Sequence, residues 1–142
     1  MAELRQQAIK LLARREHTRA ELARKLAPHG TPEEIETVLA DLERSELLSD
    51  SRAASAWVRG HAARFGAAKL RQTLRSKGVA GELIEEQVAE LPAEIDRARE
   101  VWAKKFGAAP ADAREWARQA RFLQSRGFAG DVIRRLLKEP AQ

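Results

Sequence analysis

The 142-residue chain lacks cysteine and has no long apolar run. Without cysteine it can form neither disulfides nor thiolate metal sites. The first fifteen residues alternate charged and apolar types, so we expect no secretory signal peptide. No apolar stretch approaches the roughly 18 residues needed to span a bilayer. We therefore expect a soluble, cytoplasmic protein with no membrane partner.

Signals for β-strands are also scarce. Only 5% of the residues are aromatic, and no run of β-branched residues alternates with polar ones. Ala, Leu, Arg and Glu dominate instead, and all four favour helices. The composition predicts an all-α fold.

The fingerprints of catalysis are missing as well. The sequence has no phosphate-binding glycine loop, no paired-histidine zinc helix and no recognisable nucleophile with its base. His17, His29 and His61 are far apart and fall near helix ends or flanks, which favours turn or packing roles. We expect no enzyme activity, no cofactor, no bound metal and no small-molecule substrate.

A pattern of leucine, glycine and a second apolar residue occurs three times, at intervals of 48 and 49 residues. The three occurrences are Leu26, Gly30 and Ile35; Leu74, Gly78 and Leu83; and Leu123, Gly127 and Val132. Self-similarity at such a period is typical of arrays whose units bury a core against their neighbours. It predicts an elongated array of three tandem three-helix repeats, each resembling a helix-turn-helix unit. We place them at residues 1–48, 49–92 and 93–142.

Local signals place three helices in the first repeat. An apolar stripe predicts a helix over about residues 2–15. Thr18 with Glu21 predicts a capping box that opens the second helix, which Pro28 and Gly30 should end. The Thr31–Glu34 segment, with proline at the first helical position, predicts the start of the third helix.

Apolar stripes predict the core positions of the later repeats. Ile84, Val88 and Leu91 should lie on the third helix of the second repeat, which we expect to end before Pro92. Three tryptophans on such stripes are expected to pack in the core or between repeats rather than to stack on bases: Trp57, Trp102 and Trp116.

Positive charge is concentrated in the later repeats. Residues 1–50 carry 8 Lys/Arg against 10 Asp/Glu, residues 51–91 carry 7 against 4, and residues 92–142 carry 11 against 7. A basic surplus favours contact with phosphate backbones or with acidic protein surfaces. On the helix over 113–126, Arg114, Arg118 and Arg121 should form one stripe of guanidinium groups opposite Leu123.

The full set of basic residues expected to contact a partner lies in the second and third repeats. It comprises Arg52, Arg59, Arg64, Lys69, Arg71, Arg75, Lys77, Arg114, Arg118, Arg121, Arg126, Arg134 and Arg135. Sequence-specific reading of the DNA major groove is not expected, because the third helix of each repeat begins with acidic residues that repel phosphate.

Three segments of the chain resemble the RecX family of bacterial regulatory proteins. They are residues 8–26, with the run Arg-Arg-Glu-His-Thr; residues 66–79, which begin Gly-Ala-Ala-Lys-Leu-Arg; and residues 121–128, with the run Phe-Leu-Gln-Ser-Arg-Gly-Phe. Their order and spacing strengthen the resemblance, which covers nearly the whole chain.

The resemblance implies a modulator of the RecA recombinase that has no catalytic activity of its own. It implies that the repeats lie along the RecA filament on single-stranded DNA and impede its ATPase, strand-exchange and coprotease activities. Recombination, DNA repair and the SOS response would then be affected. Weak direct binding of single- or double-stranded DNA is expected alongside. From the residues alone, a non-specific architectural DNA-binding protein and a helical adaptor for another protein remain alternatives.

Overall fold

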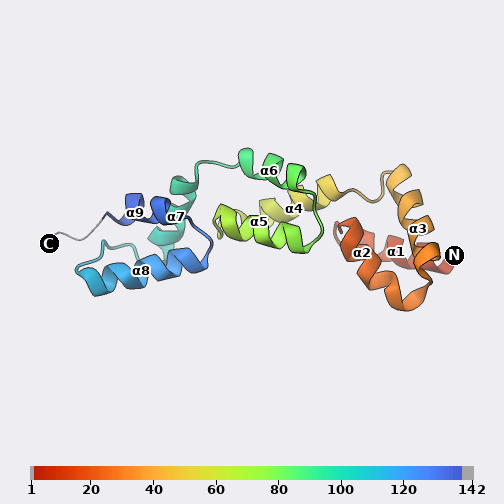
Figure 1. Ribbon diagram of the computed structural model, residues 1–142, viewed down its shortest axis with the longest axis horizontal. Helices are drawn as coiled ribbons and strands as arrows, with labels where there is room; N and C mark the ends of the chain where they lie inside the picture. Colours follow the sequence, from red (N-terminus) through yellow and green to blue (C-terminus); the bar gives the residue numbers. More distant parts are fainter. Residues whose placement is uncertain (1, 139–142) are drawn as a thin grey trace. The chain divides into compact units, whose positions relative to one another are not determined.

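The computed structural model describes residues 2–138, and all regular structure in that range is helical (Figure 1). The prediction of an all-α chain made of three-helix repeats is confirmed. The described range contains α1 (Ala2–Arg14), α2 (Arg19–Leu26), the 3₁₀ turn η1 (Ala27–His29), α3 (Pro32–Arg44), α4 (Asp50–His61), α5 (Ala67–Ser76), α6 (Gly81–Ala89), α7 (Glu94–Lys105), α8 (Ala113–Ser125) and α9 (Gly130–Leu137).

Side-chain caps open several of these helices, as the sequence predicts. Thr18 accepts a hydrogen bond from the Glu21 amide at the start of α2, and the Glu21 carboxylate accepts one from the Thr18 amide in return. Thr31 and Glu34 repeat this capping box at the start of α3. Each box satisfies two backbone N–H groups that the first helical turn leaves without partners.

The repeated glycines differ in conformation from one repeat to the next. Gly78 and Gly127 follow α5 and α8 with φ of +84° and +90°, the left-handed region that ends many helices. Gly30 instead has extended backbone, with φ −165° and ψ 172°, and it follows the 3₁₀ turn that contains Pro28. Pro28 and Gly30 do follow the end of α2 as predicted, but the stop consists of a 3₁₀ turn and an extended glycine rather than a left-handed one.

The end of α6 departs from the sequence prediction. α6 ends at Ala89, so Leu91 lies in the turn that follows rather than on the helix. Ile84 is buried, whereas Val88 and Leu91 are only half-buried.

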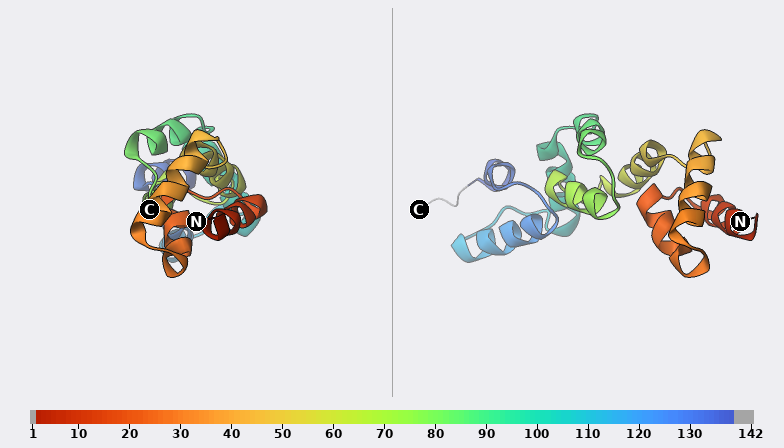
Figure 2. Two further views of the ribbon diagram at one scale, coloured as in Figure 1. Left: turned by 90° about the vertical axis from the view of Figure 1, so that its right-hand side faces the viewer. Right: turned by 45° about the vertical axis from the view of Figure 1, so that its right-hand side comes forward.

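By its internal contacts the chain divides into two compact units, and the division passes through the second repeat. The first unit holds residues 2–57 and 74–84. In it, α2 packs on α1 and α3 (Figure 2). Its core is built from leucines and other aliphatic residues: Leu4, Ala8, Leu22, Leu26, Ile35, Val38, Leu39, Leu42 and Leu48.

The second unit holds residues 58–73 and 85–138 of the described chain. There α9 packs against both α7 and α8. Its core comprises Ala98, Leu123, Phe128, Val132, Ile133 and Leu137. Trp102 and Trp116 are half-buried against this cluster, so the predicted packing role of these two tryptophans is confirmed.

Candidate functional site

Some of the basic residues predicted to contact a partner are already paired with carboxylates of the same chain. Among the described residues these pairs include Arg52 with Glu16 at 3.1 Å, Arg71 with Glu85 at 3.0 Å, Lys77 with Glu21 at 3.2 Å, and Arg118 with Glu115 at 2.7 Å. Exposed ion pairs add little stability, but they neutralise the cation towards an incoming anion.

This pairing changes the predicted stripe on α8. Arg114, Arg118 and Arg121 are all exposed, as predicted. The Glu115 carboxylate, however, accepts two hydrogen bonds from the Arg118 guanidinium, at 2.9 and 2.7 Å. These bonds raise the pKa of Arg118, and the hydrogen bonds from Arg118 and Gln119 lower the pKa of Glu115 to about 2. Of these three arginines, Arg114 and Arg121 make no ion pair with the described residues.

Other predicted residues lie exposed on the helices. Arg59 and Arg75 are exposed on α4 and α5. Arg134 and Arg135 are exposed on α9, and among the described residues neither forms an ion pair.

The remaining three predicted residues come together around one aromatic ring. The Lys69 ammonium lies 5.1 Å from the centre of the Phe65 ring, and the guanidinium groups of Arg64 and Arg126 lie at 5.6 and 5.8 Å. His61 stacks on the same ring with centroids 6.2 Å apart. A cation over an aromatic ring contributes about 0.5–1 kcal/mol at an exposed site and about 2 kcal/mol where the pair is desolvated; Phe65 is half-buried.

A second ring extends this arrangement. Arg126 also lies over Phe122 at 5.0 Å, and the Lys105 ammonium lies 5.3 Å from the same ring. Phe106 packs edge-on against Phe122 with centroids 5.4 Å apart. We call Phe65, Phe122, Arg64, Lys69, Lys105 and Arg126 the cation–ring cluster. In the part of the chain that is described, none of its four cations forms an ion pair.

Two residues of α7 hold the backbone beside Phe65. The Arg97 guanidinium donates to the carbonyl oxygens of Phe65 at 2.6 Å and Ala62 at 3.0 Å, and the Glu94 carboxylate accepts from the Ala67 amide at 2.6 Å. The positive charge of Arg97 thus lies at the C-terminal end of α4, and the negative charge of Glu94 lies at the N-terminal end of α5. Each charge stabilises the helix dipole at that end. Burial lowers the pKa of Arg97, which is only 7% exposed.

The cation–ring cluster lies where the start of α5 meets the end of α8. The Gly66 amide donates to the Arg126 carbonyl at 2.7 Å, and the Ala68 amide donates to the Gly127 carbonyl at 3.2 Å. Amide groups at the start of one helix thereby satisfy carbonyl groups at the end of another. A side chain at Gly66 would overlap the backbone of Gly127.

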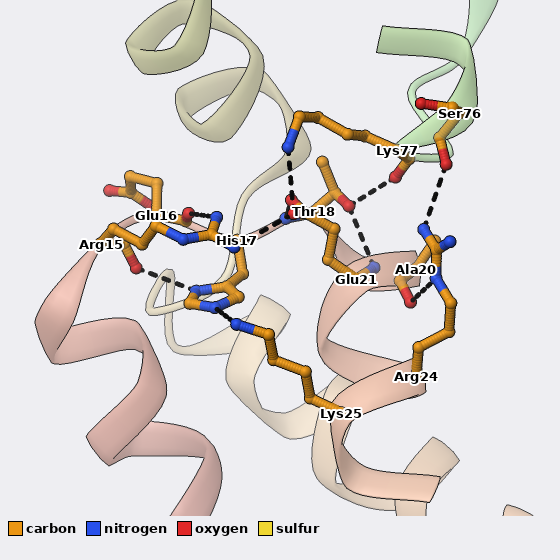
Figure 3. Close-up of polar contacts among 10 residues, drawn as sticks. All are labelled: Arg15, Glu16, His17, Thr18, Ala20, Glu21, Arg24, Lys25, Ser76 and Lys77. Carbon is orange, nitrogen blue, oxygen red and sulfur yellow. Dashed lines mark hydrogen bonds and ion pairs between the residues drawn. The ribbon is translucent and has the colours of Figure 1, made fainter. Parts of the chain in front are cut away.

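The first unit contains a similar end-to-end contact, between the end of α5 and the start of α2 (Figure 3). The Thr18 hydroxyl donates to the Lys77 carbonyl at 2.5 Å while it caps α2. The Arg24 guanidinium donates to the Ser76 carbonyl at 3.1 Å. A left-handed glycine, Gly78 or Gly127, follows the outgoing helix in each unit, whereas Gly30 is extended and a Cβ there would meet the Leu4 side chain.

Glu21 links the cap of α2 to this contact. Its carboxylate accepts from the Thr18 amide, and it also binds the Lys77 ammonium and the Arg15 guanidinium (Figure 3). Burial by itself would raise the pKa of Glu21, but the bonds from Thr18, Lys77 and Arg15 outweigh it and lower the pKa to about 2.

His17 is buried between two polar partners, which fixes its tautomer. Its Nδ1 lies 3.0 Å from the Arg15 carbonyl and must donate, so Nε2 accepts from the Lys25 ammonium at 3.0 Å (Figure 3). Burial and then the neighbouring positive charges of Arg15 and Lys25 lower the pKa of His17. The predicted packing role fits this histidine, which is 1% exposed.

Several residues of the site were missed by sequence reasoning. The Glu115–Arg118 pair has i, i+3 spacing on one helix, so an inspection of acidic neighbours could have found it. Phe65 and Phe122 each have a basic residue four positions later, Lys69 and Arg126, so this spacing could also have indicated the two contacts. Lys105 and Arg97 gave no such signal, because their partners Phe122 and Phe65 are distant in sequence. Between residues 2 and 138 no group of three or more His, Cys, Asp or Glu is arranged to hold a metal ion, and no helix is long and apolar enough to cross a membrane.

Comparison with known families gives matches in all three repeats. The family models described as the first, second and third three-helix domains of RecX match residues 5–42, 49–86 and 93–137. A protein of Leptothrix cholodnii named "Regulatory protein RecX" is 53% identical over 95% of this chain and 87% of its own length. Proteins of the same name from Ralstonia nicotianae and Pseudomonas syringae pv. tomato are 42% and 44% identical, over 95% and 94% of this chain and 86% and 89% of their own.

Solved structures agree in fold. The crystal structure of RecX from Lactobacillus salivarius matches with a TM-score of 0.79 and 18% identity, over 96% of this chain and 94% of that one. A crystal structure titled regulatory protein RecX matches with a TM-score of 0.81 and 23% identity, over 97% of this chain and 71% of that one.

Proposed function

Because this chain belongs to the RecX family of regulatory proteins, we propose that it modulates the RecA recombinase. In this proposal it acts in the cytoplasm and binds the RecA filament on single-stranded DNA. By contacting neighbouring RecA subunits it impedes filament growth, ATP hydrolysis, strand exchange and repressor cleavage. It carries out no catalysis itself.

The observation that carries the proposal is a difference in how positive charge is paired between residues 1–50 and the second unit. Residues 1–50 have an acidic surplus, and several of their arginines form ion pairs, such as Arg5 with Asp41 and Arg19 with Glu36. In the second unit Arg114 and Arg121, together with the cation–ring cluster, present positive charge that no described carboxylate neutralises. A partner that is part protein and part nucleic acid matches such a surface.

The test adds the purified protein, below one molecule per RecA subunit, to RecA filaments on single-stranded DNA with ATP. We expect slower ATP hydrolysis and shorter filaments, measured by coupled ATPase assay and electron microscopy. In the control reaction without RecA, the protein should hydrolyse no ATP.

The two alternative functions give different outcomes. An architectural DNA-binding protein would leave RecA's ATPase and filament length unchanged while binding DNA alone. A helical adaptor for another protein would change neither and would bind no DNA at any salt concentration. Either outcome would overturn the RecA proposal.

A further inference from the structure

The cation–ring cluster holds positive charge in place without neutralising it. Arg64, Lys69 and Arg126 all lie within 6 Å of the Phe65 ring centre, so three like charges gather around one ring. Elsewhere in the chain Arg71 lies beside the Glu85 carboxylate, and Arg118, which lies 5.0 Å from the centre of the Phe106 ring, is neutralised by Glu115. Like charges gathered in this way repel one another, and a bound anion would relieve the repulsion.

The aromatic rings indicate which class of anion the cluster binds. Arg126 lies over both Phe65 and Phe122, so the cluster alternates half-buried rings with flat guanidinium groups. Single-stranded nucleic acids are bound by this combination, in which cations track the phosphates and bases stack on aromatic rings or guanidinium planes. The bases of a duplex are stacked on each other and cannot reach such a surface.

The surrounding backbone is held firmly before any ligand arrives. Arg97 binds the Phe65 carbonyl, Glu94 binds the amide of Ala67, and the Gly66 amide binds the Arg126 carbonyl. These contacts anchor the backbone on both sides of the cluster, which reduces the ordering cost of binding.

We propose that the cation–ring cluster is a binding site for single-stranded nucleic acid. Phosphates lie at Arg64, Lys69, Lys105 and Arg126, and an unstacked base lies on the Phe65 side of the cluster. This inference rests on the proposed function, and it assigns the contact with single-stranded nucleic acid to the cation–ring cluster. The arginines outside the cluster, among them Arg114 and Arg121, are then left for the protein partner.

The test measures binding of a fluorescent single-stranded oligothymidine by anisotropy, without RecA. The double variant Lys69→Ala/Lys105→Ala should bind at least about fivefold more weakly, and its slope of log affinity against log salt should fall by about 1.4 for two lost phosphate contacts. The matched control Arg114→Ala/Arg121→Ala removes the same charge outside the cluster and should change affinity less than twofold. Equal losses in the two variants would overturn the assignment, because net charge alone would then explain binding.

A second arm tests the ring itself. Phe65→Leu keeps the charge, and it should weaken binding of oligothymidine about fivefold or more while leaving binding of an abasic strand of equal length unchanged. Equal effects on both strands, or equal affinity of the wild-type protein for duplex and single strand, would contradict the base-stacking site. Circular dichroism and thermal unfolding confirm that each variant is folded. If these binding tests fail while the wild-type protein still inhibits RecA, the nucleic-acid site is wrong but the proposed function stands. The failure of one proposal can therefore be distinguished from the failure of the other.

Discussion

Gly127 lies so close to Lys69 that a Cβ atom at position 127 would come within 2.5 Å of the Lys69 Cβ. This approach joins the end of α8 to the start of α5, and it requires both the left-handed backbone of Gly127 and the absence of its side chain. The repeated glycine is therefore a requirement of the contact between helices as well as a helix stop.

The variant Gly127→Ala should accordingly lose more stability than a left-handed glycine outside the contact. Gly107 is the matched control, because it has φ +71° but an added Cβ would meet only the Ala103 carbonyl at 3.3 Å. We expect a loss of about 1–2 kcal/mol for Gly107→Ala from backbone strain alone, and about 3 kcal/mol or more for Gly127→Ala. Urea unfolding measures both, and similar losses would show that the close approach is not important.

The Thr18 cap should contribute more than the equivalent cap of Thr31. Both residues open a helix through a capping box, but only Thr18 also donates to a distant carbonyl, that of Lys77. Loss of either cap by substitution with alanine should cost about 1 kcal/mol, and Thr18→Ala should cost about 1 kcal/mol more for the hydrogen bond it breaks. Chemical denaturation of the two single variants gives the comparison, and equal costs would argue against a role for the Lys77 contact.

Reversal of charge at Arg114 and Arg121 should weaken inhibition of RecA. The variant Arg114→Glu/Arg121→Glu removes from α8 two guanidinium groups that pair with no described carboxylate. We expect that several times more of this variant is needed for half-maximal inhibition of RecA's ATPase. Glu115→Ala/Arg118→Ala is the control, because it removes a pair that is already neutral and its loss should have little effect. Undiminished inhibition by the double variant would mean that this face of α8 meets only solvent.

Stability should fall as the pH drops below about 6.5 because His17 is buried as the neutral imidazole. Its pKa is lowered in the folded chain, first by burial and then by positive neighbours, while the unfolded chain titrates near 6.5. The unfolded state therefore takes up the proton first, so the stabilisation is present above about pH 6.5 and is lost as the pH falls through the folded pKa.

Urea unfolding at pH 7.5 and 5.5 measures this dependence. His17→Gln should show a smaller difference between the two pH values than the wild-type chain, whatever its stability at pH 7.5. His29→Gln, at an exposed position, should keep the wild-type difference. If His17→Gln shows the same difference in stability as the wild-type chain, the pH dependence comes from other groups.

The sequence by itself determined the local features of this protein. The capping boxes at Thr18 and Thr31 follow from side chains that interact within one helical turn. The helical nature of all regular structure in residues 2–138 follows from apolar periodicity. The Glu115–Arg118 pair belongs to the same class, because its two residues lie three positions apart on α8.

Only the tertiary structure decided which charges are used within the chain and which are left for a partner. Arg71 meets Glu85 across 14 residues, the Arg97 guanidinium reaches the Phe65 carbonyl across 32, and Arg126 lies over Phe65 from a separate helix. Gly30 and Gly127 share one sequence pattern, yet they differ in backbone because only Gly127 adjoins the start of another repeat's helix. The physical reason is the same in each case: packing brings distant segments together, and local propensity carries no information about the partner that a side chain will meet.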